Sequence, residues 1–157
     1  MHEEIRRIAS RVVWRYGTRD PFRIALYEGI HVLRPSLPPG INGFYQAVGG
    51  RRIIHVGEML SEPRSVAVCA HELGHALLHP AQNSFLLSDN PLFLPGRSER
   101  DAELFSFYLL DGGEAVRVYG TLERTASVTG LSESALLLGL EDSGRADPDR
   151  SLFPRFP

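Results

Sequence analysis

Residues 66–80 read VAVCAHELGHALLHP, and we expect the rest of the chain to pack around this stretch. Small and apolar residues lead into and out of the central HELGH, so the pattern predicts a helix that Ser61 caps and Pro80 stops. Residues four apart lie on one face of a helix, about 6 Å apart along its axis. His71 and His75 can therefore bind one metal ion.

The residues between the two histidines add chemistry and packing. In an H-E-x-x-H pattern on a helix, the glutamate, here Glu72, is expected beside the open coordination position, where it can take a proton from water activated by the metal. Gly74 costs up to about 1 kcal/mol relative to alanine inside a helix, so it should have a packing reason, such as the close approach of a second element. The alternative is a buried helix whose two histidines are hydrogen-bonded core residues.

A catalytic zinc needs a third protein ligand. His79 lies eight residues after His71, too far along the helix to join both other histidines on one ion. We expect His79 to cap the C-terminus of the helix instead, where a cation is also favoured. The remaining candidates for the third ligand are His55, Glu99, Asp101 and Glu103.

The three acids among these candidates lie in a second helix, predicted over residues 98–110. Ser98 and Asp101 hold the positions of a capping box at its start. Glu99 and Glu103 are four apart and share a face with small residues that could pack against Gly74. One carboxylate of this pair could bind the metal while the other orients a ligating histidine; the alternative is two solvated surface acids.

The remainder of the chain predicts an α+β fold. Helices are expected over residues 5–16 and 21–28 and after the capping residues Thr121 and Ser132, and strands over 30–34, 43–48 and 51–56. The last two strands should form a hairpin around a two-glycine turn. Residues 81–97 are predicted to be a long loop. We expect one domain, residues 1–143, and a flexible tail, residues 144–157.

Composition excludes several classes of protein. The chain has 157 residues and a net charge of −2, so it has no overall basic field to attract nucleic acid. Its apolar runs are far shorter than the roughly 20 residues of a membrane-spanning helix. Residues 122–140 have a helix-turn-helix outline, but the second helix, 132–140, has no basic residue, so we expect no direct contact with nucleic acid. The lone cysteine, Cys69, predicts a cytoplasmic location.

Residues 71–80, followed by Glu99-Arg100-Asp101-Ala102-Glu103-Leu104-Phe105, resemble the ImmA/IrrE family of metallopeptidases, and weaker similarity extends over roughly residues 16–140. The resemblance implies a zincin-like fold: a small, twisted, antiparallel-type sheet beside the H-E-x-x-H helix, with further helices towards the C-terminus. It implies Zn²⁺ bound by His71, His75 and Glu99, with Asp101 as the competing third ligand. Glu103 stands where the family usually has asparagine.

The resemblance also implies a zinc-dependent endopeptidase that cleaves a specific regulatory protein, such as a helix-turn-helix transcriptional repressor. Glu72 would act as the general base. A further donor would stabilise the developing oxyanion, and the candidates are His55, Arg97 and Tyr108. A peptide substrate could add to the edge of the hairpin sheet. The alternative function is a zinc-containing regulatory protein-binding module with little or no peptidase activity; the sequence does not indicate an oligomeric state.

Overall fold

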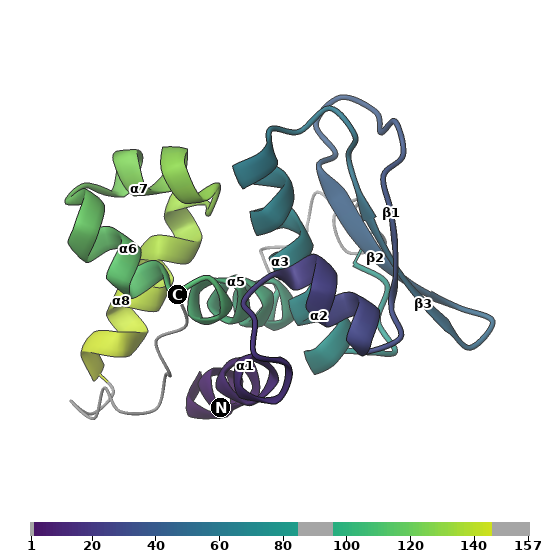
Figure 1. Cartoon of the computed structure of the whole chain (residues 1–157), viewed down its shortest axis with the longest axis horizontal. Coiled ribbons are helices and arrows are strands. Elements are labelled where there is room, and N and C mark those ends of the chain that lie inside the picture. The colour runs from purple at the N-terminus through teal and green to yellow at the C-terminus, as the bar shows by residue number, and fades with distance from the viewer. Residues whose placement is uncertain (1, 85–95, 146–157) are drawn as a thin grey trace.

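The computed structural model describes residues 2–84 and 96–145, and the elements follow one another as expected for an α+β chain (Figure 1). Most of the loop expected over 81–97, and all but the first two residues of the expected tail, lie outside the described residues. The elements are α1 (His2–Tyr16), α2 (Pro21–Tyr27), β1 (His31–Leu33), β2 (Gly43–Val48), β3 (Arg51–Val56), α3 (Glu62–Leu78), α5 (Arg97–Leu109), α6 (Gly112–Tyr119), α7 (Leu122–Thr129) and α8 (Glu133–Arg145).

The described strands form one small mixed sheet in the order β1-β3-β2. β2 and β3 make the expected antiparallel hairpin, and Gly49 and Gly50 at its tip have φ of 56° and 74°, a region that glycine enters at little cost. The chain reverses once before β2 and again at this turn, so β1 and β3 run the same way. β1 therefore pairs in parallel with β3, and the antiparallel expectation holds for the hairpin alone.

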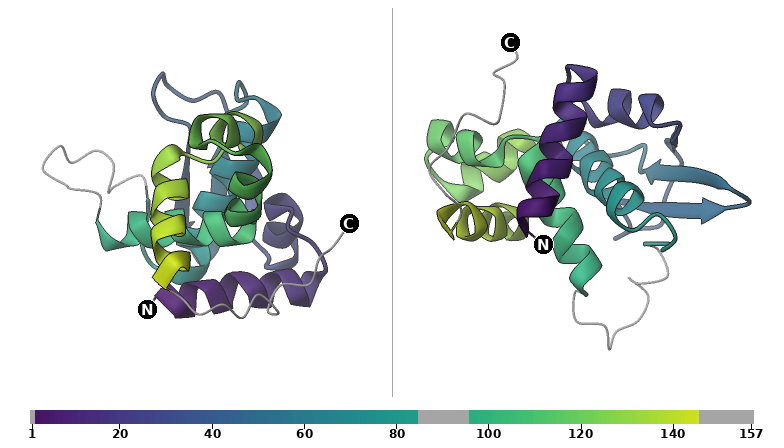
Figure 2. Two further views of the ribbon diagram at one scale, coloured as in Figure 1. Left: turned by 90° about the vertical axis from the view of Figure 1, so that its left-hand side faces the viewer. Right: turned by 90° about the horizontal axis from the view of Figure 1, so that it is seen from below.

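One face of the sheet packs against α3. Tyr45, Ile54 and Val56 are fully buried on this inner face, where the sheet contacts the helix. Side chains alternate along a strand, so Phe44 and His55 lie on the opposite face, where their rings stack with centroids 4.1 Å apart. Seen from below, the hairpin extends outwards from the helical body, with α3 beside it (Figure 2).

α5 is the central helix of the fold, because α1, α3 and α8 all pack against it. Gly74 of α3 lies at the α3–α5 crossing: a Cβ on this residue would lie 3.1 Å from Cα of Ala102 and 3.2 Å from the side chain of Phe105. The expectation that Gly74 lets a second element approach closely is thus confirmed. This crossing sets how the first turn of α5 lies beside the histidines of α3.

The ends of the two long helices differ in how well they were predicted. Ser61 caps α3 as expected, accepting a hydrogen bond from the amide of Arg64, and His79 is its C-cap residue. The capping box expected at the start of α5 is wrong. The helix begins one residue earlier, with Gly96 as N-cap and no side-chain cap, which puts Ser98 inside the first turn. The carboxylate of Asp101 pairs with His79 of α3 instead.

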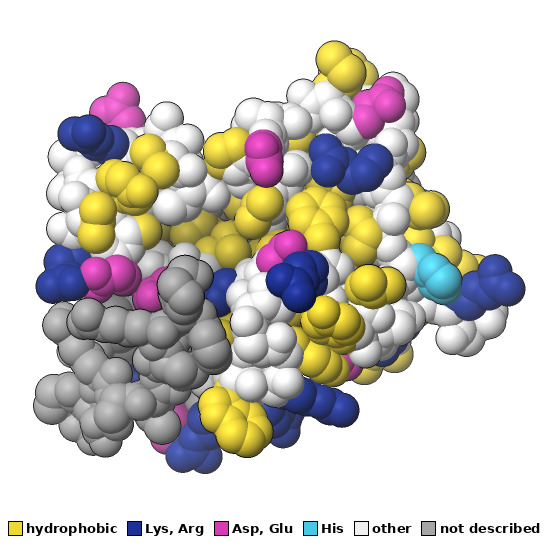
Figure 3. Space-filling model, viewed as in Figure 1, with side chains coloured by type: hydrophobic (Ala, Val, Ile, Leu, Met, Phe, Trp, Pro, Cys, Tyr) yellow, Lys and Arg dark blue, Asp and Glu magenta, His cyan; other side chains and the backbone are white. Residues whose placement is uncertain are grey.

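Helices α6, α7 and α8 form a group: α6 and α8 pack against α5, and α7 contacts α3. Thr121 caps α7, and Ser132 accepts a hydrogen bond from Ala135 at the start of α8, as expected. The guanidinium of Arg64 donates to the carbonyl of Gly130 between these helices, 2.8 Å away. On the face drawn in Figure 3, hydrophobic side chains line the hollow between this group and α3. No helix in the described ranges is both long and apolar enough to cross a membrane.

Candidate metal centre

Three predicted ligands come together where α3 meets the first turn of α5. Nε2 of His71 and Nε2 of His75 lie 3.2 Å apart, and the Glu99 carboxylate lies 3.2 Å from each, through Oε2 and Oε1 respectively. The side chain of His75 is 1 % exposed, whereas those of His71 and Glu99 are 25 % and 32 % exposed. The group is therefore buried on one side and open to solvent on the other.

This arrangement fits one metal ion. Zinc binds imidazole nitrogen and carboxylate oxygen at about 2.0–2.2 Å, and a tetrahedral centre with such bonds separates neighbouring ligand atoms by about 3.3 Å. The 3.2 Å between the two histidine nitrogens, and between each nitrogen and one oxygen of Glu99, matches that separation. Without an ion, two imidazole nitrogens that face each other can share only one proton between them. A metal ion between the rings can instead accept a lone pair from both nitrogens and from the carboxylate.

The electrostatics of the group favour a cation. Burial alone would raise the pKa of Glu99, but hydrogen bonds from His71 and His75 hold that pKa well below its usual range, so Glu99 is ionised at neutral pH. Burial alone would lower the pKa of His71, but the hydrogen bond to Glu99 and the charges of Glu72, Glu99 and Glu103 raise it overall. The acids around the histidines thus stabilise positive charge at this place.

Glu72 lies beside this group but faces the sheet. Its side chain is 6 % exposed, and its Oε2 accepts a hydrogen bond from the Ser84 hydroxyl at 2.8 Å. On the sheet side, Gly43 of β2 lies next to Glu72: a Cβ added to the glycine would be in ordinary contact with Cγ of Glu72 at 3.7 Å, and would overlap Cγ1 of Val68 at 2.5 Å. Sequence reasoning missed Ser84, because a single serine in a segment without periodicity carries no signal.

The other acidic candidates have partners elsewhere. Asp101 is 5 % exposed, and its Oδ2 lies 3.2 Å from Nε2 of His79, the C-cap residue of α3. The structure therefore brings Glu99, and not Asp101, to the two histidines. Glu103 accepts a hydrogen bond from Ser134 of α8, and among the described residues it makes no hydrogen bond to a histidine of the group.

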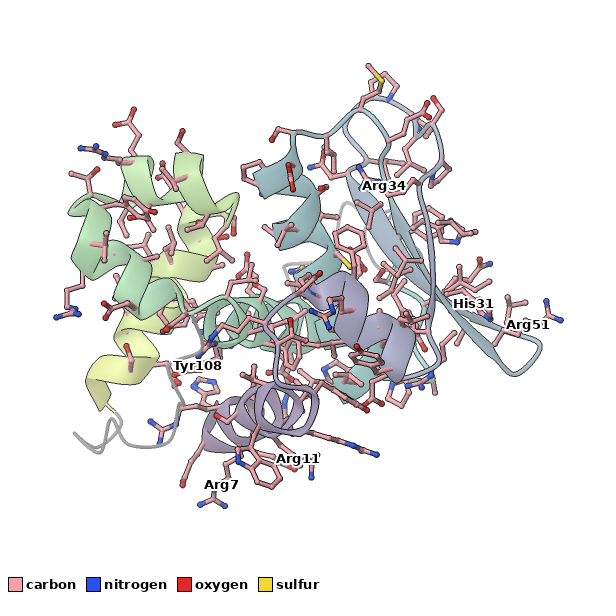
Figure 4. All side chains as sticks on the ribbon, in the orientation of Figure 1. Arg7, Arg11, His31, Arg34, Arg51 and Tyr108 are labelled. Atoms are coloured by element: carbon pink, nitrogen blue, oxygen red, sulfur yellow. The ribbon has the colours of Figure 1, made fainter. Side chains whose placement is uncertain are left out.

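The candidate oxyanion donors are placed differently from one another. His55, also a candidate third ligand, lies on the face of the sheet turned away from α3, so the structure does not bring it to the group. Tyr108 lies near α1 and α8 (Figure 4), where its hydroxyl donates to Asp142. Burial and this hydrogen bond raise the pKa of Tyr108. Arg97 is exposed in the first turn of α5, two residues before Glu99.

Comparison with known proteins identifies the family. The model of the IrrE N-terminal-like domain, Peptidase_M78, matches residues 25–118, which include the whole candidate site. The chain is 32 % identical to an uncharacterized immunity region protein 2 of Bacillus phage phi105 over 121 residues, 77 % of each chain. It is 30 % identical to the metallopeptidase ImmA of Bacillus subtilis (strain 168) over 108 residues, 68 % of this chain and 62 % of that protein. No solved structure gives a significant match. The chain belongs to the IrrE N-terminal-like family of metallopeptidases.

Proposed function

We propose that this chain is a zinc-dependent endopeptidase whose metal is held by His71, His75 and Glu99. The observation that carries the proposal is the group of donor atoms at the open junction of α3 and α5: Nε2 of His71 and Nε2 of His75 lie 3.2 Å apart, and each lies 3.2 Å from one oxygen of the Glu99 carboxylate. Two imidazoles and one carboxylate are a donor set of catalytic zinc sites, which keep a fourth position for water or substrate. Membership of a metallopeptidase family supports the same chemistry.

Glu72 is the proposed general base. When bound, zinc supplies a Lewis acid that makes water more acidic and polarises the scissile carbonyl group. Glu72 follows His71 directly in the helix, and its carboxylate would accept the proton of the attacking water and pass it to the leaving amine. Its burial favours this role, because a carboxylate shielded from bulk water exchanges its proton with the reacting groups.

The proposed substrate is one regulatory protein, such as a helix-turn-helix transcriptional repressor, in the cytoplasm. A relative named for a phage immunity region favours a regulatory substrate. The chain itself is small, with a net charge of −2, which favours a protein partner over nucleic acid.

The ligand assignment is tested by measuring zinc per chain by elemental mass spectrometry. We expect one zinc in the wild type, much less in Glu99→Gln, and a full complement in Asp101→Asn. The two variants are matched, because each turns an acid in the first turns of α5 into its amide. Full zinc in Glu99→Gln with loss in Asp101→Asn would make Asp101 the third ligand. A wild type that takes up no zinc would refute the metal site.

The reaction is tested with a helix-turn-helix repressor encoded beside the gene for this chain. We expect mass spectrometry to find a discrete new terminus in the repressor after incubation with the wild type. Glu72→Gln should keep its zinc and lose cleavage, because an amide cannot take the proton. A stable complex without scission would instead support the alternative, a regulatory zinc-containing binding module, and cleavage by zinc-loaded Glu72→Gln would exclude Glu72 as the base.

A further inference from the structure

The segment that follows α3 turns back onto the outer edge of β2. The hydroxyl of Tyr45 donates to the carbonyl of Pro80 at 2.8 Å, and the amide of Ala47 donates to Oδ1 of Asn83 at 2.7 Å. The amide of Ser84 donates to the carbonyl of Tyr45 at 3.1 Å. The last two bonds use main-chain groups of β2, whose other edge pairs with β3, so the segment is docked along the outer edge of β2.

Ser84 connects this edge to the candidate general base. Its Oγ accepts a hydrogen bond from the amide of Tyr45 at 2.6 Å and donates its proton to Oε2 of Glu72 at 2.8 Å. The carbonyl of Tyr45 lies 3.5 Å from the same hydroxyl. The carboxylate of Glu72 is closer than this carbonyl, so Glu72 is the stronger acceptor of the Ser84 proton. The Ser84 hydroxyl accepts from Tyr45 and donates to Glu72, so these two bonds hold it in one orientation.

This orientation fixes the Glu72 side chain. Ser84 is 6 % exposed, like Glu72, so water competes little for the bond between them. Cγ of Glu72 lies next to Gly43 of β2, and the Glu72 carboxylate contacts Ser84 of the docked segment. Ser84 donates to one lone pair of Oε2, so the carboxylate keeps other lone pairs that can take a proton. The segment docked on β2 thereby restrains the orientation of the Glu72 carboxylate.

We propose that Ser84 is a positioning residue, which holds the Glu72 carboxylate in the orientation that proton transfer requires. The inference rests on the proposed function, because it assigns a helper to the base of that reaction. Ser84 does not touch the substrate or the metal in this assignment; it acts through Glu72. Its removal should therefore slow the chemical step and leave substrate binding and zinc content unchanged.

The test compares Ser84→Ala with Asn83→Ala. Both substitutions remove one side-chain hydrogen bond between the segment and β2, but only Ser84→Ala also removes the donor to Glu72. The probe is the fastest-cleaved member of a fluorescence-quenched peptide library. We expect Ser84→Ala to lower kcat by on the order of tenfold to a hundredfold with unchanged KM and zinc content. Asn83→Ala should stay within about twofold of wild type, and Ser84→Thr should restore most of kcat.

Equal losses of kcat in Ser84→Ala and Asn83→Ala would overturn the proposal, because docking of the segment alone would then explain both. A wild type that cleaves no peptide would count against the proposed function, and crystal structures of the zinc-loaded wild type and Ser84→Ala then decide the question separately. A Glu72 carboxylate in the same place in both structures refutes positioning by Ser84; a carboxylate that rotates or becomes disordered only in Ser84→Ala supports it.

Discussion

Replacement of Gly130 by alanine should destabilise the protein through one defined backbone contact. Gly130 follows α7 with φ of 75° and lies against the first turn of α3. A Cβ at this position would lie 2.2 Å from the carbonyl oxygen of Pro63, 2.4 Å from its carbon, and 2.7 Å from the amide nitrogen of Arg64. These are main-chain atoms, so no side-chain rotation relieves the overlap, and the turn between α7 and α8 has to move away from α3.

Two penalties add in Gly130→Ala. A left-handed backbone costs a non-glycine residue about 1–2 kcal/mol, and forcing an extra methyl group into a packed contact costs about 1–3 kcal/mol more. Gly17 provides a matched control, because it also follows a helix and has φ of 63°, but no described atom outside its neighbours lies within 4 Å of its added Cβ. Gly17→Ala should therefore carry the first penalty alone.

The assay is urea unfolding of both variants and the wild type, followed by far-ultraviolet circular dichroism. We expect the free energy of unfolding to fall by about 2–5 kcal/mol in Gly130→Ala and by about 1–2 kcal/mol in Gly17→Ala. Equal losses in the two variants would refute the contact between the α7–α8 turn and α3. A loss in neither would refute the backbone argument as well.

Three further outcomes follow from the packing. Gly74→Ala gains about 1 kcal/mol of helix propensity, but its methyl group pushes α3 away from Ala102 of α5. Zinc affinity, measured by competition with a chelator, should therefore fall about tenfold. Unchanged affinity would contradict this. Tyr108→Phe should cost about 2 kcal/mol of unfolding free energy at pH 7 through the lost bond to Asp142. Burial first, and then that bond, raise the pKa of Tyr108 in the folded protein. The stability that the Tyr108 hydroxyl contributes is therefore present below about pH 10 and is lost as the pH rises further. Above about pH 10 the wild type should lose this stability and Tyr108→Phe should not. Burial raises the pKa of Cys69 far above its usual range, so a thiol reagent should label it only after unfolding.

The parts of the fold that were predicted well are set by local chemistry. Helix α3 follows from the spacing of its apolar residues and from Ser61 at its start, and the hairpin follows from Gly49-Gly50 between two strand-forming runs. The capping box at Ser98 failed because a nearby α3 residue, His79, competes for the Asp101 carboxylate. That competition depends on how two helices pack, which local patterns do not encode.

The same limit applies to the site. The spacing of His71 and His75 is enough to predict that they share a face. Residue spacing alone left His55, Glu99, Asp101 and Glu103 as candidates for the third ligand, because the choice among them depends on how α5 and the sheet pack against α3. Ser84 gave no sequence signal, since its partners Tyr45 and Glu72 lie 39 and 12 residues away and meet it only after the segment docks on β2.

The close crossing of α3 and α5 has a consequence for the thermodynamics of ligand binding. His71 and Glu99 are 28 residues apart in the chain, yet both belong to helices that the hydrophobic core holds together, with Leu73 and Phe105 fully buried in it. The conformational entropy lost in bringing these donors together is lost when the chain folds, and not when an ion arrives. A cation entering this junction meets a preorganised set of donors, so little of its intrinsic affinity is consumed in ordering the protein.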